Sequence, residues 1–136
     1  MTEYISKQVQ IRRPDAAIYA VISDFNNFTP ILADKVEGWA VEDDSCTFKV
    51  KGFTLRLRMV EKEPNKTVKV AGDDGSPFPF TFWVQLAGQA PDDTRMRIVL
   101  RVELNMMMKM MVGSKLQEAV DQIADQIAAS FNNAPL

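Results

Sequence analysis

One stretch near the carboxyl end decides the fold: SKLQEAVDQIADQIAASF, residues 114–131. Its large apolar side chains recur three and four residues apart, at Leu116, Val120, Ile123, Ile127 and Phe131. This spacing places all of them on one stripe of an α-helix, and a stripe that wide must be buried against another surface. The preceding chain offers one such surface, a β-sheet. The sequence therefore predicts a sheet that packs on a carboxyl-terminal helix, with room for a ligand between them.

The chain before this helix predicts an antiparallel sheet. Along residues 53–59 apolar side chains alternate with Thr and Arg, so one face of this strand is buried and the other is in water. Further strands are expected at residues 3–12, 39–41, 46–51, 67–71, 80–86 and 95–104, joined by short turns. The alternation directs a set of apolar side chains toward the helix: Leu55, Leu57, Phe82, Leu100 and Val102. The arginines between them are expected on the outer face.

Two short helices are expected after the first strand. Pro14 fits the first turn of a helix over residues 14–23, because its missing N–H is not needed there. A short second helix or turn is expected over residues 28–32. We therefore predict that residues 1–136 form one α+β domain. It has a curved seven-stranded antiparallel sheet wrapped around a long carboxyl-terminal helix.

Composition and charge exclude several classes of protein. The 136 residues carry a formal net charge of −2, and Lys and Arg are spread along the chain, which argues against the basic stripe of a nucleic-acid-binding protein. A single cysteine, Cys46, excludes an internal disulfide and favours a reducing compartment. No stretch approaches the roughly 18 apolar residues of a membrane span, and the amino terminus lacks a signal-peptide core. We expect a cytoplasmic protein with no nucleic-acid partner and no integral membrane association.

Few residues could support catalysis. The chain has no histidine, which removes the most common general base and metal ligand. Cys46 alternates with apolar Phe48 and Val50, so we expect a buried thiol and not a nucleophile. The adjacent acidic residues at 43–44, 73–74 and 92–93 lie in predicted turns, where carboxylates are usually solvated. We therefore expect no catalytic residues, no metal site and no cofactor, and the sequence does not favour an enzyme.

The sequence resembles the START-like, or SRPBCC, superfamily, whose small bacterial members are described as polyketide cyclase/dehydrase-like. The resemblance rests on PDAAIYAVISDF at residues 14–25, on Asn27-Phe28 with Pro30 after it, on the meander of strands and on the last helix. It covers essentially the whole chain. It implies a helix-grip fold, in which a bent antiparallel sheet wraps around the last helix and leaves an apolar cavity. Members of the superfamily bind lipids, sterols, plant hormones, polyketides or quinones, and some are enzymes or protein-interaction modules.

We predict a ligand-binding cavity wall made of aromatic and apolar side chains. Its members are Phe25, Phe28, Trp39, Phe48, Leu55, Leu57, Phe78, Phe80, Phe82, Met107, Met110 and Met111. Phe78 lies between Pro77 and Pro79 and cannot belong to a regular interior strand, so we expect it to form a gate at the cavity mouth. For most of the other aromatic residues, an ordinary core position is the alternative interpretation.

A run of methionines precedes the last helix, at residues 106–111. Projecting the apolar stripe backwards places Lys109 near the centre of the buried face, and residues 114–117 match a capping box. We therefore predict that the regular helix begins near Ser114 and that the methionines form a separate entry segment. Three interpretations of this segment stay open: filler of an irregular gap, a pliable cavity wall, or an exposed patch for a partner or membrane surface.

These observations favour non-catalytic binding or transport of a small apolar or amphipathic ligand, such as a lipid, a polyketide-like or a quinone-like molecule. An apolar concave wall with few polar groups is typical of ligand pockets. A cyclase or dehydratase acting on an aromatic or polyketide-like substrate is the first alternative. An interaction module with a collapsed cavity is the second.

Overall fold

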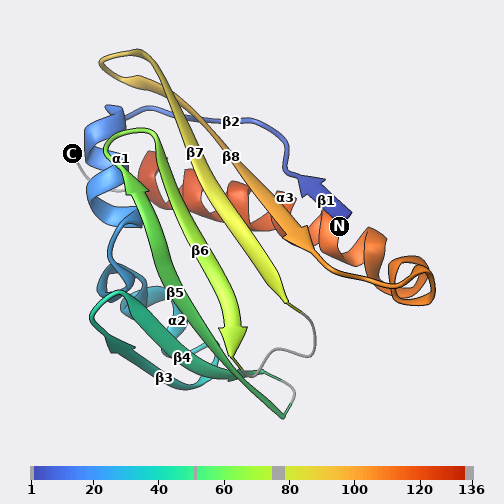
Figure 1. Ribbon diagram of the computed structural model, residues 1–136. Helices are drawn as coiled ribbons and strands as arrows, with labels where there is room; N and C mark the ends of the chain where they lie inside the picture. Colours follow the sequence, from blue (N-terminus) through green and yellow to red (C-terminus); the bar gives the residue numbers. More distant parts are fainter. Residues whose placement is uncertain (1, 51, 75–78, 134–136) are drawn as a thin grey trace.

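The computed structural model describes residues 2–50, 52–74 and 79–133. In chain order its elements are β1 (Thr2–Ile5), β2 (Val9–Ile11), α1 (Asp15–Ile22), the 3-10 helix η1 (Phe25–Phe28), α2 (Thr29–Leu32), β3 (Glu37–Glu42), β4 (Ser45–Val50), β5 (Phe53–Glu63), β6 (Thr67–Asp74), β7 (Phe80–Ala90), β8 (Asp93–Val102) and α3 (Met106–Asn132). Figure 1 shows a curved antiparallel sheet with α3 behind it. The predicted α+β architecture, with short helices early and one long helix at the end, is confirmed.

The sheet has the strand order β1-β8-β7-β6-β5-β4-β3, and β2 also pairs with β8. β1 and β2 are therefore two parts of one edge strand, where the sequence predicted a continuous strand over residues 3–12. Ser6 causes the interruption. Its N–H donates to the Ile98 carbonyl and its Oγ accepts from the Ile98 N–H, both at 2.8 Å, so a side chain replaces part of the backbone ladder.

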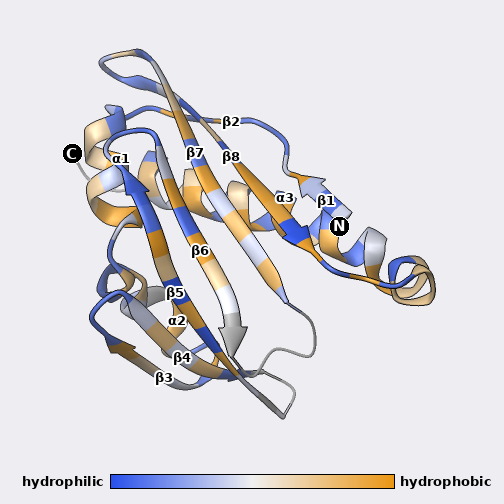
Figure 2. Cartoon of the chain, viewed as in Figure 1, coloured by the Kyte–Doolittle hydropathy of each residue, from blue (hydrophilic) through white to orange (hydrophobic). Residues whose placement is uncertain are grey.

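The register confirms the predicted faces of the strands. Leu55 lies opposite Phe48, Leu57 opposite Cys46, Phe82 opposite Leu100 and Phe80 opposite Val102. Directly opposed residues share a face, so these side chains form one surface, which we call the inner face because its β8 residues are buried under α3. Figure 2 shows the alternation of hydrophilic and hydrophobic residues along β5. The arginines of β5 and β8 lie on the outer face.

The helix α3 packs mainly on β1, β2 and β8. Its buried residues are Val120, Ala124 and Ala128, and the alanines allow the helix to approach the strands closely. Ile123 is 46% exposed, so its predicted place at the centre of the buried stripe is wrong. Leu116, Ile127 and Phe131 are half-buried.

Hydrogen bonds to the edge strand explain this rotation of α3. Gln117 Nε2 donates to the Ile5 carbonyl at 2.9 Å, and Asp121 Oδ1 accepts from the Lys7 N–H at 2.7 Å. Further along, Asn132 Oδ1 accepts from the Arg12 N–H at 2.7 Å. These polar residues lie on one flank of the helix at 100° per residue. The opposite flank, with Leu116, Ala119, Ile123 and Ile127, is consequently turned toward the inner face of the sheet.

The helix α3 begins at Met106, so the prediction that it begins near Ser114 is wrong. Asn105 is the N-cap, and its Oδ1 accepts from the Met108 N–H at 2.8 Å. Methionine is a good helix former, and one cap of this kind is enough to extend the helix over the whole run. In Figure 1 these first turns project past the end of β8.

Candidate ligand-binding face

Apolar side chains on the inner face remain half-buried although they belong to the packed side of the sheet. They are Trp39, Val41, Phe48, Leu55, Leu57, Phe80, Phe82 and Leu100. The flank of α3 that carries Leu116, Ile123 and Ile127 is turned toward them. We call these residues together the inner apolar face. A fully packed core would bury such residues, so this surface is the candidate site for an apolar ligand.

The inner apolar face is continuous across the strands. One cross-strand row runs from Leu100 through Phe82 and Val70 to Met59. Adjacent strands lie about 4.8 Å apart, so the side chains of each pair are in contact distance. Val70 and Met59 are buried, whereas Leu100 and Phe82 are half-buried. The row therefore has a closed end and an open end, and a ligand would contact the open end.

Two local packings fix aromatic rings in this surface. The Phe80 ring lies over Gly72, because a Cβ at Gly72 would be 2.1 Å from Phe80 Cζ. Trp39 and Phe48 have ring centroids 6.1 Å apart at an interplanar angle of 37°. Trp39 Nε1 donates to Thr29 Oγ1 at 2.8 Å, which ties β3 to α2 and satisfies the indole. The rings are thus held in place without using polar groups of the site.

Polar groups are sparse around the inner apolar face. Burial raises the pKa of the Cys46 thiol to about 11, and a hydrogen bond with the Leu57 backbone lowers it to a smaller extent. At neutral pH the thiol is protonated and unsuited to act as a nucleophile. Tyr4 Oη is buried and has no hydrogen-bond partner. Within residues 2–50, 52–74 and 79–133, no three Cys, Asp or Glu side chains gather to hold a metal ion.

The structure brings half of the predicted wall residues together. Trp39, Phe48, Leu55, Leu57, Phe80 and Phe82 share the inner face. Phe25 is buried in the core and Phe28 is half-buried against it. Phe78 lies outside the described residues. A contact of any of these residues with a ligand stays a prediction.

The predicted methionines occupy a different environment. Met107, Met110 and Met111 are 71, 83 and 68% exposed on the first turns of α3. For these three residues, the interpretation as buried gap filler is therefore wrong. Sequence reasoning did not include Tyr4 and Leu100 in the wall, although they continue the same cross-strand row. Leu100 has the same alternation as its neighbours on β8 and could have been included on that signal.

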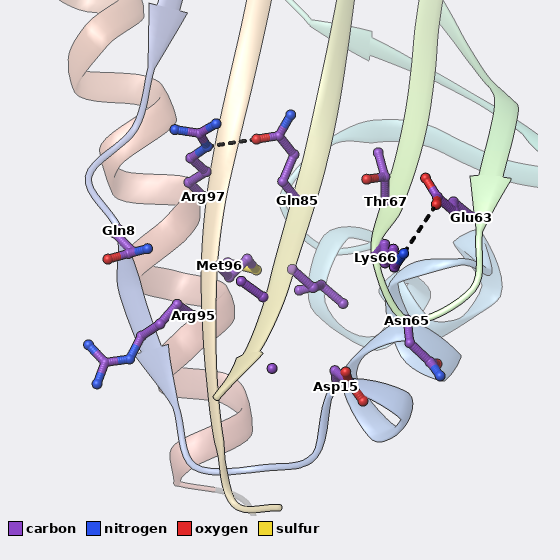
Figure 3. A pocket seen from close by; sticks show the side chains of 13 residues that line it. Gln8, Asp15, Glu63, Asn65, Lys66, Thr67, Gln85, Arg95, Met96 and Arg97 are labelled. Atoms are coloured by element: carbon purple, nitrogen blue, oxygen red, sulfur yellow. Dashed lines mark hydrogen bonds and ion pairs between the residues drawn. The ribbon is translucent and has the colours of Figure 1, made fainter. Parts of the chain in front are cut away.

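A separate hollow of about 590 Å³ lies between the β5–β6 turn, β7, β8 and α1. Figure 3 shows its polar lining, with Arg97 and Gln85 side by side and Asp15 on the other side of the hollow. Arg97 Nε donates to Gln85 Oε1 at 2.6 Å, and Lys66 pairs with Glu63 at 3.7 Å. Because these groups already have partners in one another, the hollow does not define a site for a reaction.

The curved antiparallel sheet, the long carboxyl-terminal helix and the apolar face between them define a START-like domain with the helix-grip fold. The chain belongs to the CoxG family of carbon monoxide dehydrogenase subunits, which it matches over residues 8–134. No curated protein sequence matches the chain significantly.

Solved structures with the same fold include an enzyme and proteins without a described activity. Norcoclaurine synthase from Thalictrum flavum, in complex with dopamine and hydroxybenzaldehyde, has a TM-score of 0.76 and 11% identity, with 99% of this chain and 90% of that chain covered. A START superfamily protein from Mycobacterium smegmatis has a TM-score of 0.66 and 15% identity, with 92% and 96% covered. A protein from Thermobifida fusca has a TM-score of 0.71 and 12% identity, with 95% and 91% covered. At these identities the likeness shows the fold alone.

Proposed function

We propose that the protein binds a small apolar or amphipathic molecule on the inner apolar face and carries it without chemical change. The observation that supports this proposal best is the set of half-buried apolar side chains on the inner face, opposite the apolar flank of α3. The START-like fold supports it as well, because a protein of this fold has been seen in complex with two small aromatic molecules. We propose a lipid, a polyketide-like or a quinone-like molecule as the ligand.

The energetic reason is the apolar area that a ligand would remove from water. Full burial of a Leu or Ile side chain stabilises by roughly 1.5–3 kcal/mol, so covering a half-exposed one contributes about 1 kcal/mol. Several such side chains meet on this face. A ligand that contacts three or four of them gains enough to offset part of the cost of immobilisation. An acid–base reaction is not favoured, since the described part of the face offers one hydroxyl and one protonated thiol.

We also propose that the protein acts in the cytoplasm and without a nucleic-acid partner. None of the described helices is long and apolar enough to cross a membrane. The arginines that the sequence spreads along the chain gather on the outer face of the sheet, where Arg95 pairs with Asp93 and Arg101 with Glu3. The Arg95 side chain, by its hydrogen bond, lowers the pKa of Asp93. These ion pairs reduce the positive charge that a nucleic acid would need.

A matched pair of isoleucines tests the proposal. Ile123 is 46% exposed on the flank of α3 that is turned toward the inner face, and Ile5 is 43% exposed on the outer face, opposite Val99. The dye N-phenyl-1-naphthylamine fluoresces strongly in an apolar site. We expect the wild type to bind it, Ile123→Asn to weaken the binding by about fivefold, and Ile5→Asn to leave it unchanged. No dye binding by the wild type, or equal effects of the two variants, would contradict the proposal.

A further inference from the structure

Tyr4 has a hydroxyl that is buried without a hydrogen-bond partner. The residue is 9% exposed, and Tyr4 Oη is the one buried side-chain nitrogen or oxygen without a partner among the described residues. Such a hydroxyl loses its hydrogen bonds to water and gains none in return. Phenylalanine would fill the same space without this loss. The hydroxyl therefore has a use that the free protein does not show.

Tyr4 stands at the border of the inner apolar face. On the sheet it lies directly opposite Leu100, and Leu100 lies opposite Phe82. Its hydroxyl extends to α3, because a Cβ added to Gly113 would be 3.1 Å from Tyr4 Oη and 4.0 Å from Tyr4 Cζ. The hydroxyl is thus located where β1 and α3 meet, one strand away from the half-buried residues of the site.

The part of α3 that covers Tyr4 is weakly attached. Within the described residues, side-chain hydrogen bonds between α3 and the β1–β2 edge begin at Gln117, after this part of the helix. The turns before Gly113 carry methionines that are mostly exposed, so little packing holds them. Glycine is also the poorest helix former apart from proline. The first turns of α3 can therefore move away from Tyr4 at low cost.

We propose that Tyr4 determines which ligands the inner apolar face prefers. Its hydroxyl donates a hydrogen bond to an oxygen atom, carbonyl or hydroxyl, of an otherwise apolar ligand, and the first turns of α3 move aside to admit that oxygen. This inference rests on the proposed function. A hydrocarbon ligand would gain nothing from the hydroxyl, whereas a ligand with an oxygen in this position would supply the missing partner.

The test compares two ligands that differ in one group. Benzophenone and diphenylmethane have similar shapes, but only benzophenone carries a carbonyl. Each is titrated against bound N-phenyl-1-naphthylamine in the wild type and in Tyr4→Phe. The two ligands differ in their transfer from water, so the quantity of interest is the change in their affinity ratio between the two proteins. Tyr19→Phe, a half-buried tyrosine on α1, is the matched control.

We expect Tyr4→Phe to weaken benzophenone by about 2- to 10-fold and to leave diphenylmethane and the melting temperature unchanged or slightly raised. Tyr19→Phe should alter neither ligand. If Tyr4→Phe leaves the affinity ratio unchanged while the dye binds normally, the role of Tyr4 is refuted and the proposed function stands. A lower melting temperature with both ligands weakened equally would show a structural role instead. Absence of dye binding in the wild type would refute the proposed function, and the role of Tyr4 with it.

Discussion

Gly113→Ala should have different effects in the presence and absence of the Tyr4 hydroxyl. Replacing an interior helix glycine by alanine stabilises by about 1 kcal/mol. In the wild type the new Cβ would be 3.1 Å from Tyr4 Oη, so the buried hydroxyl must shift and part of the gain is lost. In Tyr4→Phe the nearest ring atom is Cζ at 4.0 Å, an ordinary contact. We therefore expect a gain near zero in the wild type and of about 1 kcal/mol in Tyr4→Phe.

The assay is urea unfolding of the wild type, the two single variants and the double variant, with the free energies compared as a double-mutant cycle. We expect a coupling of about 0.5–1 kcal/mol. Ser114→Ala serves as the control, because the neighbouring Ser114 is exposed and its substitution should add to Tyr4→Phe without coupling. Additivity of Gly113→Ala and Tyr4→Phe within about 0.3 kcal/mol would refute the close contact on which the reasoning depends.

Burial and hydrogen bonding lead to three further predictions. Ala124 is fully buried, so Ala124→Leu should destabilise by about 1–3 kcal/mol in urea unfolding, whereas Ile123→Ala should cost less than about 1 kcal/mol; the reverse order would show that α3 is rotated differently. The pKa of Cys46 is raised to about 11, above pH 8, so the thiol is protonated there and iodoacetamide should label it slowly in the folded protein and rapidly in urea; equal rates would contradict its burial. Ser6→Ala leaves the buried Ile98 N–H without its acceptor and should lower stability by about 1–3 kcal/mol, measured by thermal unfolding, and an unchanged melting temperature would mean that the bond has no net value.

The start of α3 shows how a local signal can mislead. Residues 114–117 match a capping box, and Lys109 falls on the predicted buried side, so the sequence indicated an interruption. The structure has a continuous helix because Asn105 caps it earlier. Lys109 causes no conflict, because the first turns project past the end of β8 in Figure 1. The extent of a helix depends on what lies beside it, and sequence periodicity does not contain that information.

The sequence by itself determined the faces of the strands and the presence of the last helix. An alternation such as that over residues 53–59 has a period of two, so a shift by one residue would expose every apolar side chain, and local order alone sets the face. The rotation of α3 was decided by tertiary structure. Gln117, Asp121 and Asn132 bind backbone groups more than a hundred residues earlier in the chain, and no local pattern records such bonds. Those bonds turn Ile123 toward the inner face and place Gly113 on Tyr4, which is why the candidate site became visible only in the folded chain.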